Sequence, residues 1–346
     1  MQTSALDDRS REVLKSLIQL HIATGEPVGS ESVARLMSRQ VSPATIRNIM
    51  AELERLGYLD HPHTSAGRMP TDEGYRFYVD SLMSHRPLPA PEAAAIESEL
   101  RPADSPAHVM QSASTLLSRL SRNVGFVLAP HVALGTLRHI DLVRLPYPRI
   151  LAVVVSGAGL LAHRVIELEE ELTQDELQTC ANYLNTNFAG VSLLAIRARL
   201  VELMQEEKAL YDSLLKRAFA VGEQAFAVDA DGSDVYLEGA SNILEYLEFE
   251  DVSRMREIFR TFEAKGRLVK ILNACLGDGV RITIGHENPD PGLRTLAVVS
   301  AAYPVEGEAA WGVGVMGSTR MEYDRMIALV DHVARAVSAA LKDVRS

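Results

Sequence analysis

The sequence predicts a multidomain α+β protein with an N-terminal winged helix-turn-helix. Three observations support this fold class. The chain has 346 residues, which suits two or three domains better than one. A capped amphipathic helix, a glycine and a turn-rich hairpin follow one another within the first 70 residues. Beyond them, strand-like segments are interrupted by a mainly helical block and then resume, which indicates an α+β domain with an insertion.

Two helices are predicted before the capped helix. The first covers Asp7 to Ala23 and the second, a short one, runs from about Ser30 to Met37. Their expected inward residues recur with helical spacing: Val13, Leu14, Leu17, Ile18, Ile22, Val33, Leu36 and Met37. A short helix followed by a longer one is the order of a helix-turn-helix motif.

The longer helix is predicted to begin after Ser42 and to end before Gly57. Ser42 can cap it by accepting a backbone N–H, and Pro43 suits the first helical position because its missing N–H would be unpaired there. The apolar residues Ile46, Ile49, Met50, Leu53 and Leu56 predict one buried face. Gly57 is typical of a helix end.

The opposite face of this helix carries side chains suited to DNA. Arginine can bind guanine, asparagine can bind adenine, and threonine or alanine can contact the thymine methyl group. The helix N-terminus also attracts phosphate. We therefore expect DNA contacts from Ser42, Ala44, Thr45, Arg47 and Asn48.

A hairpin with a polar tip follows and is predicted to be the wing. Between Ser32 and Ala51 the chain has three arginines and no acidic residue, and between His61 and Thr71 it has one arginine and no acidic residue. A capped amphipathic helix alone is a common structural device, but this acid-free setting favours a DNA-binding role. The expected further contacts come from Arg35, Arg39, His63, Thr64, Ser65 and Arg68.

The remaining chain divides by composition. Residues 85–106 hold five prolines and predict a linker with one short helix between Pro91 and Leu100. Helices are predicted at 105–121, 174–187, 193–213, 251–276 and 323–344, and strands at 124–128, 137–145, 150–156, 160–167, 280–285, 293–302 and 312–316. The expected domains are residues 1–84, a linker 85–104, the first part of an α+β domain 105–171, an inserted helical block 172–250, and the second part 251–346.

Other candidate chemistry is weak. Gly157-Ala158-Gly159 lacks the full dinucleotide-binding spacing and precedes a strand, so it predicts a hairpin turn. The acidic stretch from Asp229 to Asp234 lacks the glycine and glutamate of a calcium loop and is interpreted as a polar turn. His61 and His63 have no cysteine or carboxylate partners nearby and fit a hairpin tip. No catalytic motif, metal site or cofactor site is predicted, so we do not expect an enzyme.

Charge and composition set the remaining bounds. The net charge of −11 opposes DNA binding, but residues 1–86 carry ten Lys or Arg against eleven Asp or Glu, so the excess acid lies in the rest of the chain. One such near-neutral module would bind DNA with only modest affinity. Two modules are therefore expected to act together, in a homodimer. The isolated Cys180 and Cys275 predict buried thiols rather than a disulfide. Without a long apolar run or a signal peptide, a cytoplasmic protein without a membrane partner is expected.

The sequence resembles the HrcA-type heat-inducible transcription repressors of bacteria. The resemblance is carried by GEPVGS (25–30), SPATIRN (42–48), AELERLGYL (51–59) and the long, specific block PHTSAGRMPTDEGYRFYVD (62–80). NVGFVLAP (123–130) and GVGVMGSTRMEYDRMI (312–327) extend it more weakly to nearly the whole chain. Two positions depart from the family pattern: Ile49 replaces a usual acidic residue and Glu31 replaces a common basic one. Both departures bear on operator preference.

The resemblance implies more than the residues alone. It implies a GAF-like α+β domain interrupted by an inserted dimerisation domain, a homodimer on double-stranded DNA, and an inverted-repeat operator called CIRCE ahead of chaperone operons. It also implies that the GroE chaperonin tunes the repressor's activity in the stress response. Two alternatives remain open at this point. One is a metabolite-responsive regulator with a small-molecule site in the GAF-like domain, and the other is an enzyme with a regulatory N-terminal domain.

Overall fold

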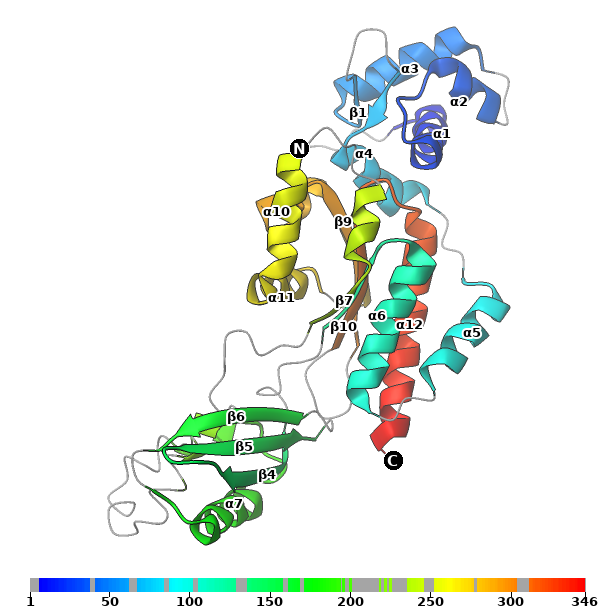
Figure 1. Cartoon of the computed structure of the whole chain (residues 1–346). Helices are drawn as coiled ribbons and strands as arrows, with labels where there is room; N and C mark the ends of the chain where they lie inside the picture. Colours follow the sequence, from blue (N-terminus) through cyan, green and yellow to red (C-terminus); the bar gives the residue numbers. More distant parts are fainter. Residues whose placement is uncertain are drawn as a thin grey trace.

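The chain forms an elongated molecule with the N-terminal helical domain at one end, a central five-stranded sheet and a smaller sheet unit at the other end (Figure 1). The computed structural model describes residues 6–37, 41–61, 67–83, 87–101, 105–128, 136–157, 161–168, 171–193, 195–196, 199–200, 218, 221–222, 224–225, 235–245, 252–276, 279–303 and 311–345. No helix in this part of the chain combines the length and apolar composition that a membrane crossing requires.

The N-terminal domain is a winged helix-turn-helix, as predicted. It contains α1 (Asp8–Thr24), α2 (Ser30–Leu36), α3 (Pro43–Arg55), β1 (Leu59–Asp60), β2 (Met69–Pro70), α4 (Asp72–Phe77) and a π-helical turn η1 (Tyr78–Leu82). Side chains such as Leu14, Leu17 and Ile46 are fully buried between the three helices. One expectation was wrong: Leu36, the last residue of α2, is 49% exposed, whereas Val33 and Met37 are buried as predicted.

The central sheet has the strand order β7-β3-β10-β9-β8, with every neighbouring pair antiparallel in the described chain. Its strands are β3 (Val124–Leu128), β7 (Val235–Glu238), β8 (Gly279–Ile284), β9 (Leu296–Tyr303) and β10 (Trp311–Ser318). Alternate residues face opposite sides: Val299 and Val315 lie in one core, and Val298 and Met316 in the other. The strand β7, which has only four residues, was not predicted from the sequence. The preceding residues 226–234 lie outside the part of the chain that the structure describes.

Helices cover both faces of this sheet (Figure 1). On one face α6 (Pro106–Ser121) and α12 (Tyr323–Arg345) pack side by side, with α5 (Ala90–Leu100) against α12. On the other face lie α10 (Val252–Glu263) and α11 (Lys265–Ala274). A single helix over 251–276 was expected and is wrong. The chain leaves helical geometry at Ala264, between α10 and α11, and both Phe262 and Leu268 are buried in the core.

The third unit has its own sheet and its own core. The strands β4 (Leu137–Arg144), β5 (Arg149–Ser156) and β6 (Leu161–Glu167) form an antiparallel sheet in that order, covered on one face by α7 (Gln174–Phe188). The composition of the chain predicts that residues 105–171 belong to the central domain and that the insertion starts at 172. In the structure β4, β5 and β6 instead share a core with α7, separate from the five-stranded sheet.

Candidate nucleic-acid interface

The recognition helix α3 begins with the cap that the sequence predicts. The Ser42 hydroxyl accepts a hydrogen bond from the Thr45 backbone N–H at 3.2 Å, and Pro43 occupies the first turn. The Ser42 and Thr45 hydroxyl groups also share a hydrogen bond of 2.9 Å. These bonds satisfy part of the helix start and hold Thr45 half-buried against Ser42.

The two faces of α3 differ as predicted. Ile46, Met50 and Leu53 are buried, while Arg47 and Asn48 are exposed. Ser42 and Ala44 are exposed as well. The helix ends where Gly57 adopts a φ of 85°, a left-handed conformation that disfavours other residues. The structure thus leaves an uncovered polar surface, carrying one positive charge at Arg47, at the N-terminal end of α3.

The wing is fixed to the domain at its base. β1 and β2 pair antiparallel, and Val28 and Arg68 exchange two backbone hydrogen bonds of 2.8 and 2.9 Å. A side chain on Gly67 would have its Cβ 2.4 Å from the Val28 backbone, so this close approach requires glycine. The predicted tip residues His63, Thr64 and Ser65 lie outside the described residues.

Arg68 joins the wing to the recognition helix. Its Nε donates to the Glu54 carboxylate at 2.7 Å, and its side chain is 20% exposed. From its place in the acid-free hairpin, Arg68 is predicted to face DNA. The ion pair gives this residue a second role that the sequence did not indicate, because Glu54 lies 14 positions away on another element.

The remaining arginines near α3 lie in different surroundings. Arg35 is exposed on α2, with Nη2 3.4 Å from the Ser32 hydroxyl. Arg55 forms a two-point ion pair with Glu52, and this hydrogen bonding lowers the pKa of the Glu52 carboxyl from its ordinary value. Arg39 lies outside the described residues. Arg55 is therefore already paired with an acid, while Arg35 and Arg47 present their charge to solvent.

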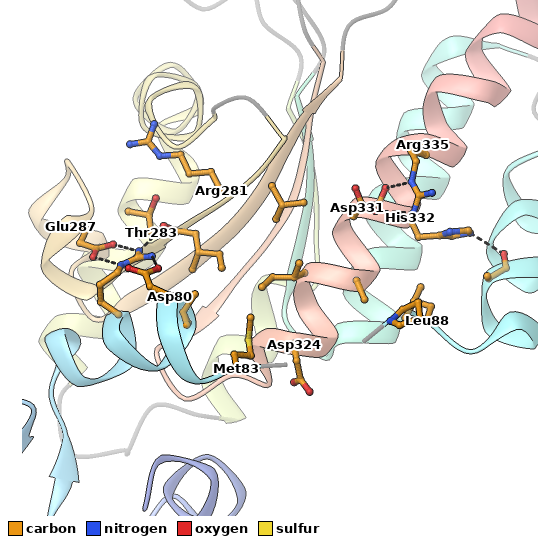
Figure 2. A pocket seen from close by; sticks show the side chains of 18 residues that line it. Asp80, Met83, Leu88, Arg281, Thr283, Glu287, Asp324, Asp331, His332 and Arg335 are labelled. Carbon is orange, nitrogen blue, oxygen red and sulfur yellow. Dashed lines mark hydrogen bonds and ion pairs between the residues drawn. The ribbon is translucent and has the colours of Figure 1, made fainter. Parts of the chain in front are cut away.

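A cavity of about 1200 Å³ lies away from α3, between η1, β8 and α12 (Figure 2). Its apolar wall includes Val79, Met83 and Ile327, and charged side chains surround it. Several of these charges pair with one another: Arg76 with Glu287 and Asp80, and Arg335 with Asp331. Among the residues that the structure describes, no group of three His, Cys, Asp or Glu side chains could hold a metal ion. Cys180 and Cys275 are both buried thiols, as predicted.

Comparison with known families decides the identity of this fold. The family model described as the winged helix-turn-helix transcription repressor, HrcA DNA-binding, matches residues 5–81. The model described as the HrcA protein C terminal domain matches residues 107–327. The chain belongs to the HrcA family. It is thus a transcription repressor of the heat-inducible HrcA type with a winged-helix DNA-binding domain.

Individual HrcA relatives match almost end to end. The heat-inducible transcription repressor HrcA of Geobacter sulfurreducens is 42% identical over 97% of this chain and 98% of its own length. The HrcA of Syntrophobacter fumaroxidans is 38% identical over 98% of this chain and 99% of its own. A crystal structure described only as a hypothetical protein has the same fold, with a TM-score of 0.63, 24% identity and coverage of 98% of this chain and 100% of that one.

The HrcA block that carried the resemblance, residues 62–80, divides between two surroundings in the structure. Its described part starts at Gly67 in the wing and continues through Thr71 into α4, which faces the central domain rather than solvent. Thr71 caps α4 by accepting from the Gly74 N–H at 3.1 Å, a Ser/Thr cap that the sequence could have indicated. The partners of α4 in the central domain, Glu287 and His286, lie more than 200 positions away and could not be found from spacing.

Proposed function

We propose that this HrcA repressor binds an inverted-repeat operator of the CIRCE type as a homodimer, one recognition helix per half-site. The observation that carries the proposal is the uncovered N-terminal surface of α3, with Arg47 and Asn48 exposed beside a capped helix start. A helix presented in this way fits the major groove, where base edges can be distinguished.

The side chains of the interface take different parts in the proposal. Arg47 and Asn48 bind base edges, Ala44 and the Thr45 methyl group contact thymine methyl groups, and Ser42 lies near phosphate at the helix start. Arg35 and Arg39 add backbone contacts from the preceding segment. His63, Thr64, Ser65 and Arg68 contact the sugar-phosphate backbone or minor groove from the wing, with Arg68 also held by Glu54.

The homodimer proposal is supported by an apolar face of the β4-β5-β6 sheet. The face opposite α7 carries three cross-strand rows: Val143, Leu151 and Val165; then Asp141, Val153 and His163; then His139, Val155 and Leu161. Val143, Val165 and Leu161 are 40%, 52% and 62% exposed. Contiguous exposed aliphatic side chains of this kind mark interaction surfaces.

The arrangement of the polar residues on this face favours a second copy of the chain as the occupant. In a two-fold packing with the axis parallel to β5, Val153 opposes the partner's Val153 and Asp141 opposes the partner's His163. A two-fold interface must be self-complementary in this sense. We infer that the inserted dimerisation unit includes β4, β5 and β6 and therefore begins near residue 136 rather than at 172.

The regulatory part of the proposal rests on the family resemblance. HrcA relatives are named heat-inducible transcription repressors. For this chain we propose a cytoplasmic repressor of chaperone operons that needs the GroE chaperonin to reach its active form. When heat-damaged proteins occupy the chaperonin, the amount of active repressor falls and the operons are transcribed.

A gel-shift titration tests this function. Purified protein is titrated onto an inverted-repeat CIRCE probe and a scrambled probe, with and without chaperonin. The proposal predicts preference for the inverted repeat and a larger active fraction with chaperonin. Equal binding to both probes in both conditions contradicts it.

One observation favours a second function, control by a small ligand. The cavity between η1, β8 and α12 is large enough for a metabolite and lies between the DNA-binding domain and the central domain. A thermal-shift screen of cell metabolites tests it. A compound that raises the unfolding midpoint and also alters operator affinity supports ligand control. If the screen finds no compound with both effects, ligand control is contradicted.

A further inference from the structure

The helix α4 lies at a polar and aromatic junction between the DNA-binding domain and the central domain. Arg76 makes the most contacts. Its Nε and Nη2 donate to the two Glu287 oxygens at 2.7 and 2.5 Å, Nη2 also donates to the Ile282 carbonyl at 2.7 Å, and Nη1 donates to Asp80 at 3.2 Å. Glu287 in turn accepts the Ile284 N–H at 2.8 Å. The guanidinium is therefore fixed by planar two-point recognition by Glu287, which follows β8 and is labelled in Figure 2.

A second charged contact lies one turn earlier on α4. The Asp72 carboxylate accepts the His286 backbone N–H at 2.9 Å, and the same oxygen lies 2.6 Å from the His286 Nδ1. Gly285 has a φ of +52°, and a Cβ there would be 1.9 Å from Asp72 Oδ2. A side chain at position 285 would therefore displace Asp72, so the glycine is part of the junction.

Between these charged contacts the junction is aromatic and buried. Tyr75 of α4 is 2% exposed and Tyr323 of α12 is fully buried, with ring centroids 6.0 Å apart. The Tyr75 hydroxyl bonds to His21 Nδ1 of α1 at 2.7 Å. Gly25, which ends α1 with a φ of +76°, leaves room for Arg320 of the central domain, whose Nη1 would be 1.8 Å from a Cβ there.

The junction connects rigidly to the recognition helix. Thr71, the cap of α4, donates its hydroxyl to the Gly57 carbonyl at 2.6 Å and its N–H to the Tyr58 carbonyl at 3.1 Å. Gly57 and Tyr58 follow α3 after its cap residue Leu56. A Cβ on Gly74 would be 2.2 Å from the Tyr58 carbonyl oxygen, so α4 lies in direct contact with the end of the α3 segment.

We propose that Asp72, Tyr75 and Arg76, together with Glu287, His286 and Tyr323, are positioning residues that set the angle of the recognition helix relative to the central domain. These six residues are called the α4 junction below. Its function is to hold the two recognition helices of a dimer at the separation and direction that an inverted repeat requires. This inference rests on the proposed homodimer. It assigns the second half of the HrcA sequence block, Asp72 to Asp80, to domain orientation rather than to DNA contact.

Three single substitutions and one charge-swapped double substitution test the junction in the full-length protein. Glu287→Gln keeps the shape of the side chain and removes the charge that holds Arg76. Glu73→Gln is the matched control, because it makes the same change of charge at an exposed position of α4. Arg76→Glu places two acids together, and Arg76→Glu combined with Glu287→Arg restores an opposite pair.

Three affinities are measured for each variant: for a single half-site, for the full inverted repeat, and for a repeat with one extra base pair between half-sites. We expect Glu287→Gln to bind the half-site within twofold of wild type and the full repeat about tenfold more weakly, a typical size for coupling between sites. Its penalty for the extra base pair should be smaller than that of the wild type. Arg76→Glu should behave like Glu287→Gln or worse, and the charge-swapped pair should recover most of the loss.

Amide hydrogen exchange gives a measure that does not depend on DNA. We expect faster exchange in α4 and η1 of Glu287→Gln, with α1 and α3 unchanged and Glu73→Gln like wild type. Unchanged α4 exchange, or equal losses on half-site and full repeat without recovery in the swapped pair, would overturn the positioning role. If the wild type binds the full repeat no better than a half-site, the homodimer proposal fails instead, and the exchange result alone decides the junction.

Discussion

The DNA-binding domain and the inserted unit both leave a face uncovered, but the two faces differ in chemistry. On α3 the exposed residues are short or polar, with Arg47 and Asn48 beside a helix N-terminus. On the β4-β5-β6 sheet they are mainly aliphatic, with Val143, Leu161 and Val165 exposed. A polar face with one or two charges gives sequence discrimination but little affinity. An apolar face gives association, and association doubles the number of recognition helices on one operator.

The largest effect is expected from the apolar face. Val165→Asp places a charge in the proposed interface, where the partner's sheet would desolvate it, so the variant should sediment as a monomer. Loss of the second recognition helix should weaken full-repeat binding by about 10²–10⁴-fold. Gln178→Asp is the control, because it adds the same charge to the exposed side of α7 in the same unit. A dimeric Val165→Asp would remove the contrast between the two faces.

The next effect concerns the polar face. Arg47→Ala should cost about 1–3 kcal/mol of operator binding per half-site and relax base preference at one position. Its unfolding midpoint should stay near wild type, because Arg47 is exposed. Quantitative footprinting on a set of single-base operator variants measures both quantities. Wild-type preference at every position would mean that α3 does not read the operator.

A smaller effect is expected at the base of the wing. Arg68→Ala should weaken binding to all sequences alike and lower the salt-dependence slope by about one unit if the side chain reaches phosphate. Glu54→Gln provides the comparison, since it frees Arg68 without removing it. An unchanged salt slope for Arg68→Ala, together with similar losses in both variants, would show that Arg68 acts only by fixing the wing to α3.

The last prediction concerns how the stability of the DNA-binding domain depends on pH. Burial of His21, with the Arg320 charge nearby, lowers its pKa to about 4 from an ordinary value of 6.5. The unfolded chain takes up a proton at this residue below pH 6.5, while the folded domain does so only near pH 4. Stability of the DNA-binding domain should therefore fall as the pH drops from 6.5 to 4. Thermal unfolding at pH 7 and pH 4.5 should show a steeper loss for wild type than for His21→Gln, and equal losses would contradict this cause.

The sequence predicted the elements of the DNA-binding domain well because their signals are local. Ser42, Pro43 and Gly57 mark the start and end of α3 within the chain itself, and helical spacing identifies Ile46, Met50 and Leu53 as buried. The same local signals predicted most strands of the central sheet. The alternating burial along β5 was not predicted, because residues 150–155 are all apolar and carry no period-2 pattern.

What the sequence could not give depends on contacts between distant segments. The pairing of Arg76 with Glu287 joins positions 211 residues apart, and no residue near Arg76 in the sequence predicts it. The strands β4, β5 and β6 form a sheet of their own because they pair with one another. The periodicity of a strand does not show which partner it pairs with, so the sequence could not separate this sheet from the central one. The break at Ala264 reflects how two short helices cover one sheet face, while the amphipathic pattern continues through it.

The central claim is that two copies of this chain, joined through an apolar face, place two α3 helices on one inverted repeat. Sedimentation of the protein–DNA complex on the full repeat and on a single half-site tests it most directly. We predict two chains per full repeat, and much tighter binding there than on the half-site, for wild type and for Gln178→Asp. We predict that Val165→Asp binds both probes weakly. One chain per repeat in the wild-type complex, with equal affinity for both probes, would contradict the account.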